Sequence, residues 1–390
     1  MVRSSSIFSQ ILSFLPRQEF DALVAKHNGD FASKGFSCRD QFVAMSFCHL
    51  AQAKSLSEIC NGLHGALGKL VHLGLDSAPK KSTLAYANEH RPWELYRDLF
   101  YAMLPWCRQF APSKKFRFKN KLLSLDTTVV MLCLSLFPWA NYTRIKGAIK
   151  LHLLLDHDGY LPSFALLTEG SVSDVRLAQL LALPKDSILV MDAGYNDYGM
   201  FARWIRQGVF FVTRMRTNTA YNVVESRVVP AGRNIISDEI IEFSHDKAWS
   251  DCPYQLRRVV VWDDVNEREL VLLTNHLHFG ASTISAIYKD RWQIELFFKA
   301  IKQSLRIKTF VGISVNAVHI QIWTALIAML VLKVLQFRSR AGWSLSNLVA
   351  MLKWNLLTYR GLDEWLADPY SERGIAPVFV QLEFPFGQHP

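Results

Sequence analysis

The chain has 390 residues, half of them hydrophobic, which is enough to bury a large core and to form two or three domains. Its 44 Lys and Arg residues outnumber its 34 Asp and Glu residues, and the resulting net charge of +10 favours a polyanionic partner. The six cysteines form no Cys-x-x-Cys pair and show no ligand spacing, which argues against a zinc site or a disulfide framework and fits a reducing cytoplasm.

Residues 1–112 carry apolar side chains at helical spacing and almost no strand pattern, which predicts an all-helical region. Within it, SLSEICNGL (55–63) and KKSTLAYANEHRPW (80–93) are predicted to be capped helices, the second beginning at Ser82. This second helix could enter a major groove in the helix-turn-helix manner, or it could be an ordinary surface helix. Its candidate DNA contacts are Lys80, Lys81 and Arg91.

The next segment, SKKFRFKNK, interleaves basic residues with Phe116 and Phe118. Such a pattern suits a nucleic-acid backbone, although a solvated linker also explains a run of charge. Its candidate DNA-binding residues are Lys114, Lys115, Arg117 and Lys119.

After residue 121 the pattern changes to apolar, strand-like runs, and the order β-β-β-α-β-α-β predicts a mixed α/β sheet. Short strands replace helical periodicity over 217–275, and helix returns at about 282 and continues to about 366. The apolar run 322–332 is too short to span a bilayer, so it is predicted to be a core helix and no membrane is expected as a partner. The elements predicted before residue 217 are strands at 122–128, 148–156 and 160–168, a helix at 174–183, a strand ending at Asp192, a helix ending at Gly208, and a strand at 209–216.

Two acids stand out by their position in this sheet. Asp126 lies on the first strand among apolar residues, and Asp192 lies at the carboxyl end of ILVMD, where active sites of open α/β sheets tend to lie. A carboxylate in such a place is costly unless it is paired or metal-bound, although it could also cap the next turn. Asp156 and Asp158 flank the turn HDG and are better explained as turn residues, and Asp197 is predicted to cap a helix.

YKDRWQIELFFKAIKQSLR (288–306) is predicted to be one helix whose polar residues form a stripe roughly 80° wide. The apolar residues on its other faces, Trp292 and Leu296 among them, are expected to be buried. Glu295 could pair with Arg291 or Lys299 at i, i+4 spacing, or it could hold a metal ion while its basic neighbours hold phosphates. The stripe consists of Tyr288, Arg291, Glu295, Lys299, Lys302 and Arg306.

The segments LDTT, MDAGYND and YKDRWQIELFFKAIK resemble the three acidic motifs of bacterial insertion-sequence transposases of the DDE class, in the insertion-sequence-four family. Members of that family carry a signature in which Tyr, Arg, Glu and Lys are separated by two, three and six residues, in that order. The resemblance covers roughly 120–335, and the 102 residues between Asp192 and Glu295 match the β-strand insertion in the RNase H-like core of the family. Here the spacing is met by Tyr288, Arg291, Glu295 and Lys302.

The resemblance implies an α/β protein: an RNase H-like mixed-sheet catalytic core with a β-strand insertion, preceded by an all-α N-terminal domain and followed by a helical C-terminal region. The implied parts are a helical DNA-binding domain (1–112), the first part of the core (113–216), the β-rich insertion (217–280), the second part of the core with the Glu helix (281–312), and the helical C-terminal region and tail (313–390).

The implied function is cut-and-paste transposition, with double-stranded DNA (terminal inverted repeats and target) as partner and a homodimer in the synaptic complex, in the bacterial cytoplasm and on the nucleoid when bound to DNA. Cleavage and strand transfer are in-line displacements at phosphorus, served by two divalent ions about 3.5–4 Å apart. Mg²⁺, for which Mn²⁺ can substitute, takes oxygen ligands. The implied catalytic and metal-binding residues are Asp126, Asp192 and Glu295. The implied DNA contacts of the core are Tyr288, Arg291, Lys299, Lys302, Arg306, Arg214 and Arg216.

Two alternatives use the same residues. An RNase H-fold nuclease or junction resolvase could employ the same acids, but the insertion and the basic helix disfavour it, and strand joining would distinguish the two. A non-catalytic DNA-binding descendant is disfavoured because all three acids are present.

Overall fold

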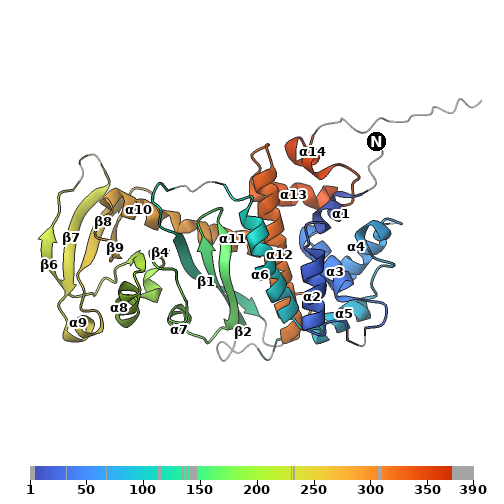
Figure 1. The fold of residues 1–390 in the computed structure, drawn as a ribbon, viewed down its shortest axis with the longest axis horizontal. Helices are drawn as coiled ribbons and strands as arrows, with labels where there is room; N and C mark the ends of the chain where they lie inside the picture. Colours follow the sequence, from blue (N-terminus) through green and yellow to red (C-terminus); the bar gives the residue numbers. More distant parts are fainter. Residues whose placement is uncertain are drawn as a thin grey trace, which may run out of the picture.

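The structure is a computed structural model in which helices and strands segregate along the long axis of the molecule. Figure 1 shows a helical body at one end and a sheet that extends from the middle to the other end. The prediction of a mixed α/β protein is therefore confirmed. Lys114, Lys115, Arg306 and the tail 371–390 lie outside the described residues. The structure describes residues 5–31, 33–66, 68–112, 116–132, 136, 137, 139, 147–229, 231, 233–305 and 310–370.

The helical body combines both ends of the chain. α12 packs against α6, α3 and α5, so the N-terminal and C-terminal helices share one hydrophobic core (Figure 1). Its helices are α1 (Ile7–Leu12), α2 (Arg17–Lys26), α3 (Cys38–Leu50), α4 (Leu56–His64), η1 (Leu70–Leu73), α5 (Lys81–His90), α6 (Glu94–Arg108), α12 (Val315–Arg338), α13 (Leu345–Asn355) and α14 (Leu362–Ala367).

Serine caps determine where several of these helices begin. The Ser37 hydroxyl accepts a hydrogen bond from the backbone N–H of Asp40, whose carboxylate accepts one from the backbone N–H of Ser37, a capping box that begins α3. Ser314 caps α12 in the same way through its hydroxyl. α5 has no side-chain cap and begins at Lys81, one residue before the predicted Ser82.

α12 is the central helix of the body. Among the described residues it is the one helix long and apolar enough to cross a membrane, but 89% of its most apolar stretch is buried inside the protein. The prediction that 322–332 belongs to a core helix is therefore confirmed.

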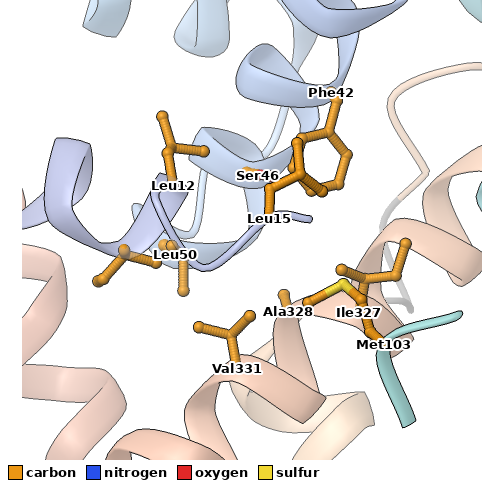
Figure 2. Close-up of a pocket in the computed structure, with 10 residues that line it drawn as sticks. Leu12, Leu15, Phe42, Ser46, Leu50, Met103, Ile327, Ala328 and Val331 are labelled. Atoms are coloured by element: carbon orange, nitrogen blue, oxygen red, sulfur yellow. The ribbon is translucent and has the colours of Figure 1, made fainter. Parts of the chain in front are cut away.

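A small apolar cavity of about 20 Å³ remains between α12 and the N-terminal helices. Figure 2 shows Leu15 and Phe42 above it and Ile327 and Val331 of α12 below it. Its lining carries no charged side chain, and its size is close to the minimum that holds one water molecule. We interpret it as a packing gap rather than a ligand site.

Within the described residues, nine strands form one sheet in the order β3-β2-β1-β4-β5-β9-β8-β7-β6. β1 is antiparallel to β2 and parallel to β4, which is parallel to β5, and the predicted order β-β-β-α-β-α-β is confirmed. The β-rich insertion joins the same sheet because β9 pairs with β5. The strands are β1 (Leu122–Leu132), β2 (Gly147–Asp156), β3 (Leu161–Glu169), β4 (Ile188–Val190), β5 (Phe210–Arg214), β6 (Tyr221–Ser226), β7 (Ile235–Phe243), β8 (Leu256–Asp263) and β9 (Arg268–Thr274).

Helices cover both faces of the central strands. Leu123 and Leu125 of β1 share a hydrophobic cluster with α8, whereas Leu122 shares one with α10. Because side chains alternate along a strand, Ser124 and Asp126 lie on the same face as Leu122. This is the face of α10, and α11 also packs on β1. The remaining helices are α7 (Asp174–Ala178), η2 (Ala193–Tyr195), α8 (Tyr198–Arg206), α9 (Asp246–Asp251), α10 (Ala281–Asp290) and α11 (Trp292–Ser304).

Three local predictions were wrong. The segment 288–306 is not one helix: α10 ends at Asp290 and α11 begins at Trp292, because the N–H of Arg291 bonds to the carbonyl of Tyr288 in a tighter, i to i+3 turn. The helix predicted at 174–183 ends at Ala178. The insertion also contains a short helix, α9, that its strand pattern did not indicate.

Candidate active site

Asp126 lies in the middle of β1, opposite Leu153 of β2. Its side chain, 22% exposed, opens into a groove of about 350 Å³ between β1 and α11. Glu295, on the first turn of α11, lines the same groove. Two of the three predicted acids are therefore brought together, with two lysines beside them. The lining residues are Asp126, Thr127, Thr128, Glu295, Phe298, Lys299, Lys302 and Gln303.

The environment of Asp126 disfavours its ionised form. The pKa of Asp126 is raised from 3.8 to about 6, chiefly by burial and also by the charges of Glu295 and Asp192, whereas the backbone N–H of Thr127 and the charge of Arg291 act to lower it. The other two acids are therefore close enough to act on the ionisation of Asp126.

Arg291 joins Asp126 to Glu295. Its Nη2 donates to Glu295 Oε1 at 2.6 Å, and its Nη1 lies 3.8 Å from Asp126 Oδ2. Its guanidinium also lies over the ring of Tyr288, 5.6 Å from the centroid, and Tyr288 is only 7% exposed. The i, i+4 pairing of Glu295 with Arg291 is confirmed, and the same arginine bridges two predicted metal ligands.

Asp192 lies just after the carboxyl end of β4, as predicted, and directly precedes η2. Its Oδ1 accepts a hydrogen bond from Arg214 Nε at 3.1 Å and forms an ion pair with Arg214 Nη2 at 3.0 Å. Asp192 is 41% exposed and Arg214 is 35% exposed, so this pair lies at the surface.

The three acids offer only oxygen atoms, the donor type that divalent Mg²⁺ prefers. Among the described residues, however, no three His, Cys, Asp or Glu side chains lie close enough together to hold one metal ion. Each acid is paired with an arginine instead: Arg291 contacts one oxygen of Glu295 and one of Asp126, and Arg214 contacts one oxygen of Asp192. The donor set fits a divalent metal site, and the arrangement of the side chains must change to form it.

A hydrogen-bonded cluster beside Asp126 was missed by the sequence reasoning. Thr127 Oγ1 lies 2.7 Å from His152 Nδ1 and 2.8 Å from the Tyr195 hydroxyl, linking β1 to β2 and to η2. Burial lowers the pKa of His152 to about 4, so His152 is neutral at physiological pH. Thr127 and Tyr195 follow the two aspartates in LDTT and MDAGY, and this proximity to the motifs was the only signal.

The other acids behave as predicted. Asp197 caps α8 by accepting from the backbone N–H of Met200 at 2.7 Å. Asp156 accepts from the backbone N–H of Asp158 in the turn after β2 and also pairs with Lys121 at 3.0 Å.

On α11, the apolar faces are less buried than predicted. Trp292 is 56% exposed and Leu296 is 42% exposed, because β1, α12 and α13 pack on other sides of the helix and leave these side chains uncovered. Lys299 is exposed and Lys302 is half-buried, so both basic side chains border the groove.

The predicted DNA contacts outside α11 differ in exposure. Arg216 is exposed at the end of β5, and Arg117 and Lys119 are exposed ahead of β1. The aromatic rings of that segment are half-buried: Phe118 lies between Phe116 and Phe279, with both centroid distances 5.1 Å. The segment is therefore a packed connection with an exposed basic side.

In the helical body, Lys80 and Lys81 are exposed at the start of α5. α5 is separated from α4 by residues 65–80, which include η1, so the pair lacks the short turn of a helix-turn-helix motif. The expectation that Arg91 contacts DNA is wrong, because it is turned inward and donates to the carbonyls of Phe36 and Ser37.

Comparison with known proteins identifies the chain. The family model described as "Transposase DDE domain" matches residues 117–331, which contain Asp126, Asp192 and Glu295. The chain belongs to this family. A second model, "Domain of unknown function (DUF4372)", matches residues 3–76 of the transposase, in the helical body.

Two curated relatives agree. The transposase is 32% identical over 262 residues to "Putative transposase y4zB" of Sinorhizobium fredii, covering 66% of this chain and 72% of that protein. It is 28% identical over 255 residues to "Probable transposase for insertion sequence element IS5377" of Geobacillus stearothermophilus, covering 65% and 66%. A piggyBac transposase synaptic complex with hairpin DNA aligns at TM-score 0.45 and 11% identity over 94% of this chain and 82% of that chain.

The chain is thus a bacterial insertion-sequence transposase of the DDE class, an enzyme that acts on DNA. Its family generally uses divalent metal ions. The predicted membership of the bacterial insertion-sequence transposases of the DDE class is confirmed.

Proposed function

We propose that this transposase catalyses cut-and-paste transposition at Asp126, Asp192 and Glu295. The observation that carries the proposal is that Asp126 and Glu295 face one groove together with Lys299 and Lys302. Acids that hold divalent ions and bases that hold phosphates are the two components that phosphoryl transfer requires. Their arrangement along one groove supports a DNA strand lying against β1 and α11.

The strand order supports an RNase H-like core. The five strands β3-β2-β1-β4-β5 form a sheet in which β2 is antiparallel to its neighbours and β1, β4 and β5 are parallel. In this order Asp126 is on the central strand and Asp192 follows the adjacent one, so the two acids are carried by neighbouring strands.

Mg²⁺ is the proposed ion, with Mn²⁺ able to replace it. Asp126, Asp192 and Glu295 would hold the ions, which would supply activation of the attacking oxygen and stabilisation of the leaving oxygen at phosphorus. In this proposal Arg291 releases Asp126 and Glu295, and Arg214 releases Asp192, because each guanidinium competes with a cation for a carboxylate oxygen.

The released arginines are suited to phosphate. Arg291 can hold a phosphate with two N–H groups, and Lys302 with a point charge. The Tyr288 hydroxyl remains a donor beside Arg291, since burial raises the pKa of Tyr288. The further DNA contacts that we propose are Lys299, Arg306, Arg214, Arg216, Lys80, Lys81, Lys114, Lys115, Arg117 and Lys119.

The remaining parts of the proposal concern the whole assembly. The helical segment 1–112 binds the terminal repeats, and the core (113–216 and 281–312), whose sheet the insertion (217–280) extends, cuts and joins DNA. The C-terminal region (313–390) serves the synaptic complex. That complex contains two copies of the chain, one for each end, in the bacterial cytoplasm.

The test uses amide variants that preserve shape and remove charge. Asp126→Asn, Asp192→Asn and Glu295→Gln should each abolish Mg²⁺-dependent cutting of a duplex carrying the ends of the element, while end binding stays nearly intact. Asp197→Asn is the matched control, because asparagine is an equally good N-cap and the residue lies near the same motif.

Substantial cutting by one of the three variants would remove that residue from the site. Cutting without strand joining by the wild-type protein would indicate a nuclease or resolvase instead of a transposition reaction.

A further inference from the structure

A buried hydrogen-bonded chain links three distant parts of the sequence. Ser124 Oγ lies 2.7 Å from His157 Nε2, and His157 Nδ1 lies 2.7 Å from Asp290 Oδ2. Ser124 is on β1, His157 is in the turn after β2, and Asp290 is the last residue of α10. Their exposed fractions are 0%, 6% and 4%. With a neutral imidazole, the Ser124 hydroxyl donates to Nε2 and the Nδ1–H group donates to the carboxylate.

The order serine, histidine, aspartate is that of a nucleophilic triad, but burial excludes that role. A nucleophile must reach a substrate, and Ser124 has no exposed surface. These hydrogen bonds therefore act on the protein itself, by holding together β1, the turn after β2 and the end of α10.

Those elements carry the acids of the active site. Ser124 precedes Asp126 by two residues on the same face of β1. Asp290 is adjacent to Arg291 and lies one turn before Glu295, at the junction of α10 and α11. The hydrogen-bonded chain thus fixes the strand of one acid to the helix junction of another.

The turn that presents His157 is itself strained. Tyr160 has a φ of +53° beside Gly159 at +80°, a conformation that residues other than glycine rarely adopt. The Tyr160 hydroxyl donates to Asp290 Oδ2 at 3.1 Å, and its ring lies 5.5 Å from that of His157. Two side chains of one strained turn therefore converge on Asp290, which suggests a constraint beyond ordinary packing.

We propose that Ser124, His157 and Asp290 are positioning residues that keep Glu295 at its distance from Asp126 when Arg291 leaves both carboxylates. In the structure, Arg291 is the direct link between the two acids. Once Arg291 turns to a DNA phosphate, that link is lost, and the buried chain remains as the connection between strand and helix. This inference rests on the proposed function of the three acids.

The test compares two replacements of Asp290 in the full-length protein. Asp290→Asn keeps an oxygen that can accept from His157 and Tyr160, whereas Asp290→Leu has a similar size and keeps no acceptor. Ser124→Ala is a milder second variant that removes one hydroxyl. The matched control is Asp98→Leu, which breaks a different His–Asp pair, His27 Nε2 to Asp98 Oδ2 at 2.9 Å, in the helical body.

Two measurements do not need DNA cutting. Hydrogen exchange of peptides spanning 286–298 should accelerate in Asp290→Leu and, less strongly, in Ser124→Ala, and should stay near wild type in Asp290→Asn and Asp98→Leu. The affinity of the protein for Mn²⁺, measured by calorimetric titration, should fall about tenfold or more in Asp290→Leu and recover in Asp290→Asn, as for groups that orient metal ligands.

A third measurement connects the hydrogen bonds among Ser124, His157 and Asp290 to activity. The rate of strand joining should fall in Asp290→Leu and Ser124→Ala, while their affinity for the ends of the element stays unchanged. A higher Mn²⁺ concentration should restore part of the lost rate. Wild-type exchange of 286–298 and wild-type Mn²⁺ affinity in Asp290→Leu or Ser124→Ala would overturn the inference. A wild-type protein that neither cuts nor joins DNA would instead refute the proposed function, and hydrogen exchange would still decide whether the buried chain holds the helix junction.

Discussion

Replacing Asp126 with asparagine should stabilise the protein while it removes activity. Burial raises the pKa of Asp126 from 3.8 to about 6, so the folded protein disfavours the ionised form that prevails at pH 7. At about 1.4 kcal/mol for each tenfold change in proton affinity, this rise corresponds to roughly 3 kcal/mol of lost stability. Asparagine carries no charge and keeps an acceptor for the N–H of Thr127, and the net pKa rise already includes the attraction of Arg291, so we expect a gain of up to about 3 kcal/mol.

The pH dependence identifies the source of this gain. Between pH 4 and pH 6 the folded protein binds more protons at Asp126 than the unfolded chain does, so stability falls as pH rises through this window. The asparagine variant has no ionisable group at this position, so it lacks this contribution to the pH dependence of stability. The difference in stability between the two proteins should vanish below about pH 4 and reach its full value above about pH 6.

The assay is urea unfolding at several pH values between 4 and 8 in metal-free buffer with a chelator. Added Mn²⁺ should then stabilise the wild-type protein and leave the variant unchanged, because a ligand that binds only the folded state raises its stability. A variant that is less stable than wild type at pH 7, or a stability difference that does not depend on pH, would refute the reasoning.

Three further predictions concern the basic and aromatic groups. Lys302→Ala should fold normally and bind the ends more weakly, and the salt dependence of its binding constant should decrease by about one phosphate contact. An unchanged salt dependence would show that Lys302 contacts no phosphate. Tyr288→Phe keeps the buried ring beneath Arg291, so thermal unfolding should be unchanged and joining reduced, whereas normal joining would limit Tyr288 to packing. Arg91→Ala should lower the free energy of unfolding by about 1–3 kcal/mol through lost bonds to backbone carbonyls, and a reduced salt slope of DNA binding would contradict its inward position.

The order of the strands and helices could be predicted from the sequence because it depends on local periodicity. The sequence also placed Asp126 on the first strand and Asp192 after the fourth, since a strand end follows from a change of pattern. The cap at Asp197 was predicted for the same reason, because a cap involves only the next three residues. The pairing of Glu295 with Arg291 is likewise a property of helical spacing.

Only the tertiary structure decided which of these residues meet and in what state. His157 and Asp290 are 133 positions apart, and no local pattern relates them. The bridge from Arg291 to Asp126 depends on how α11 packs on β1, and the exposure of Trp292 depends on how little covers the other side of that helix. The sequence thus determined the elements and the chemistry of their side chains, whereas long-range packing determined the contacts, the burial of Asp126 and hence its raised pKa.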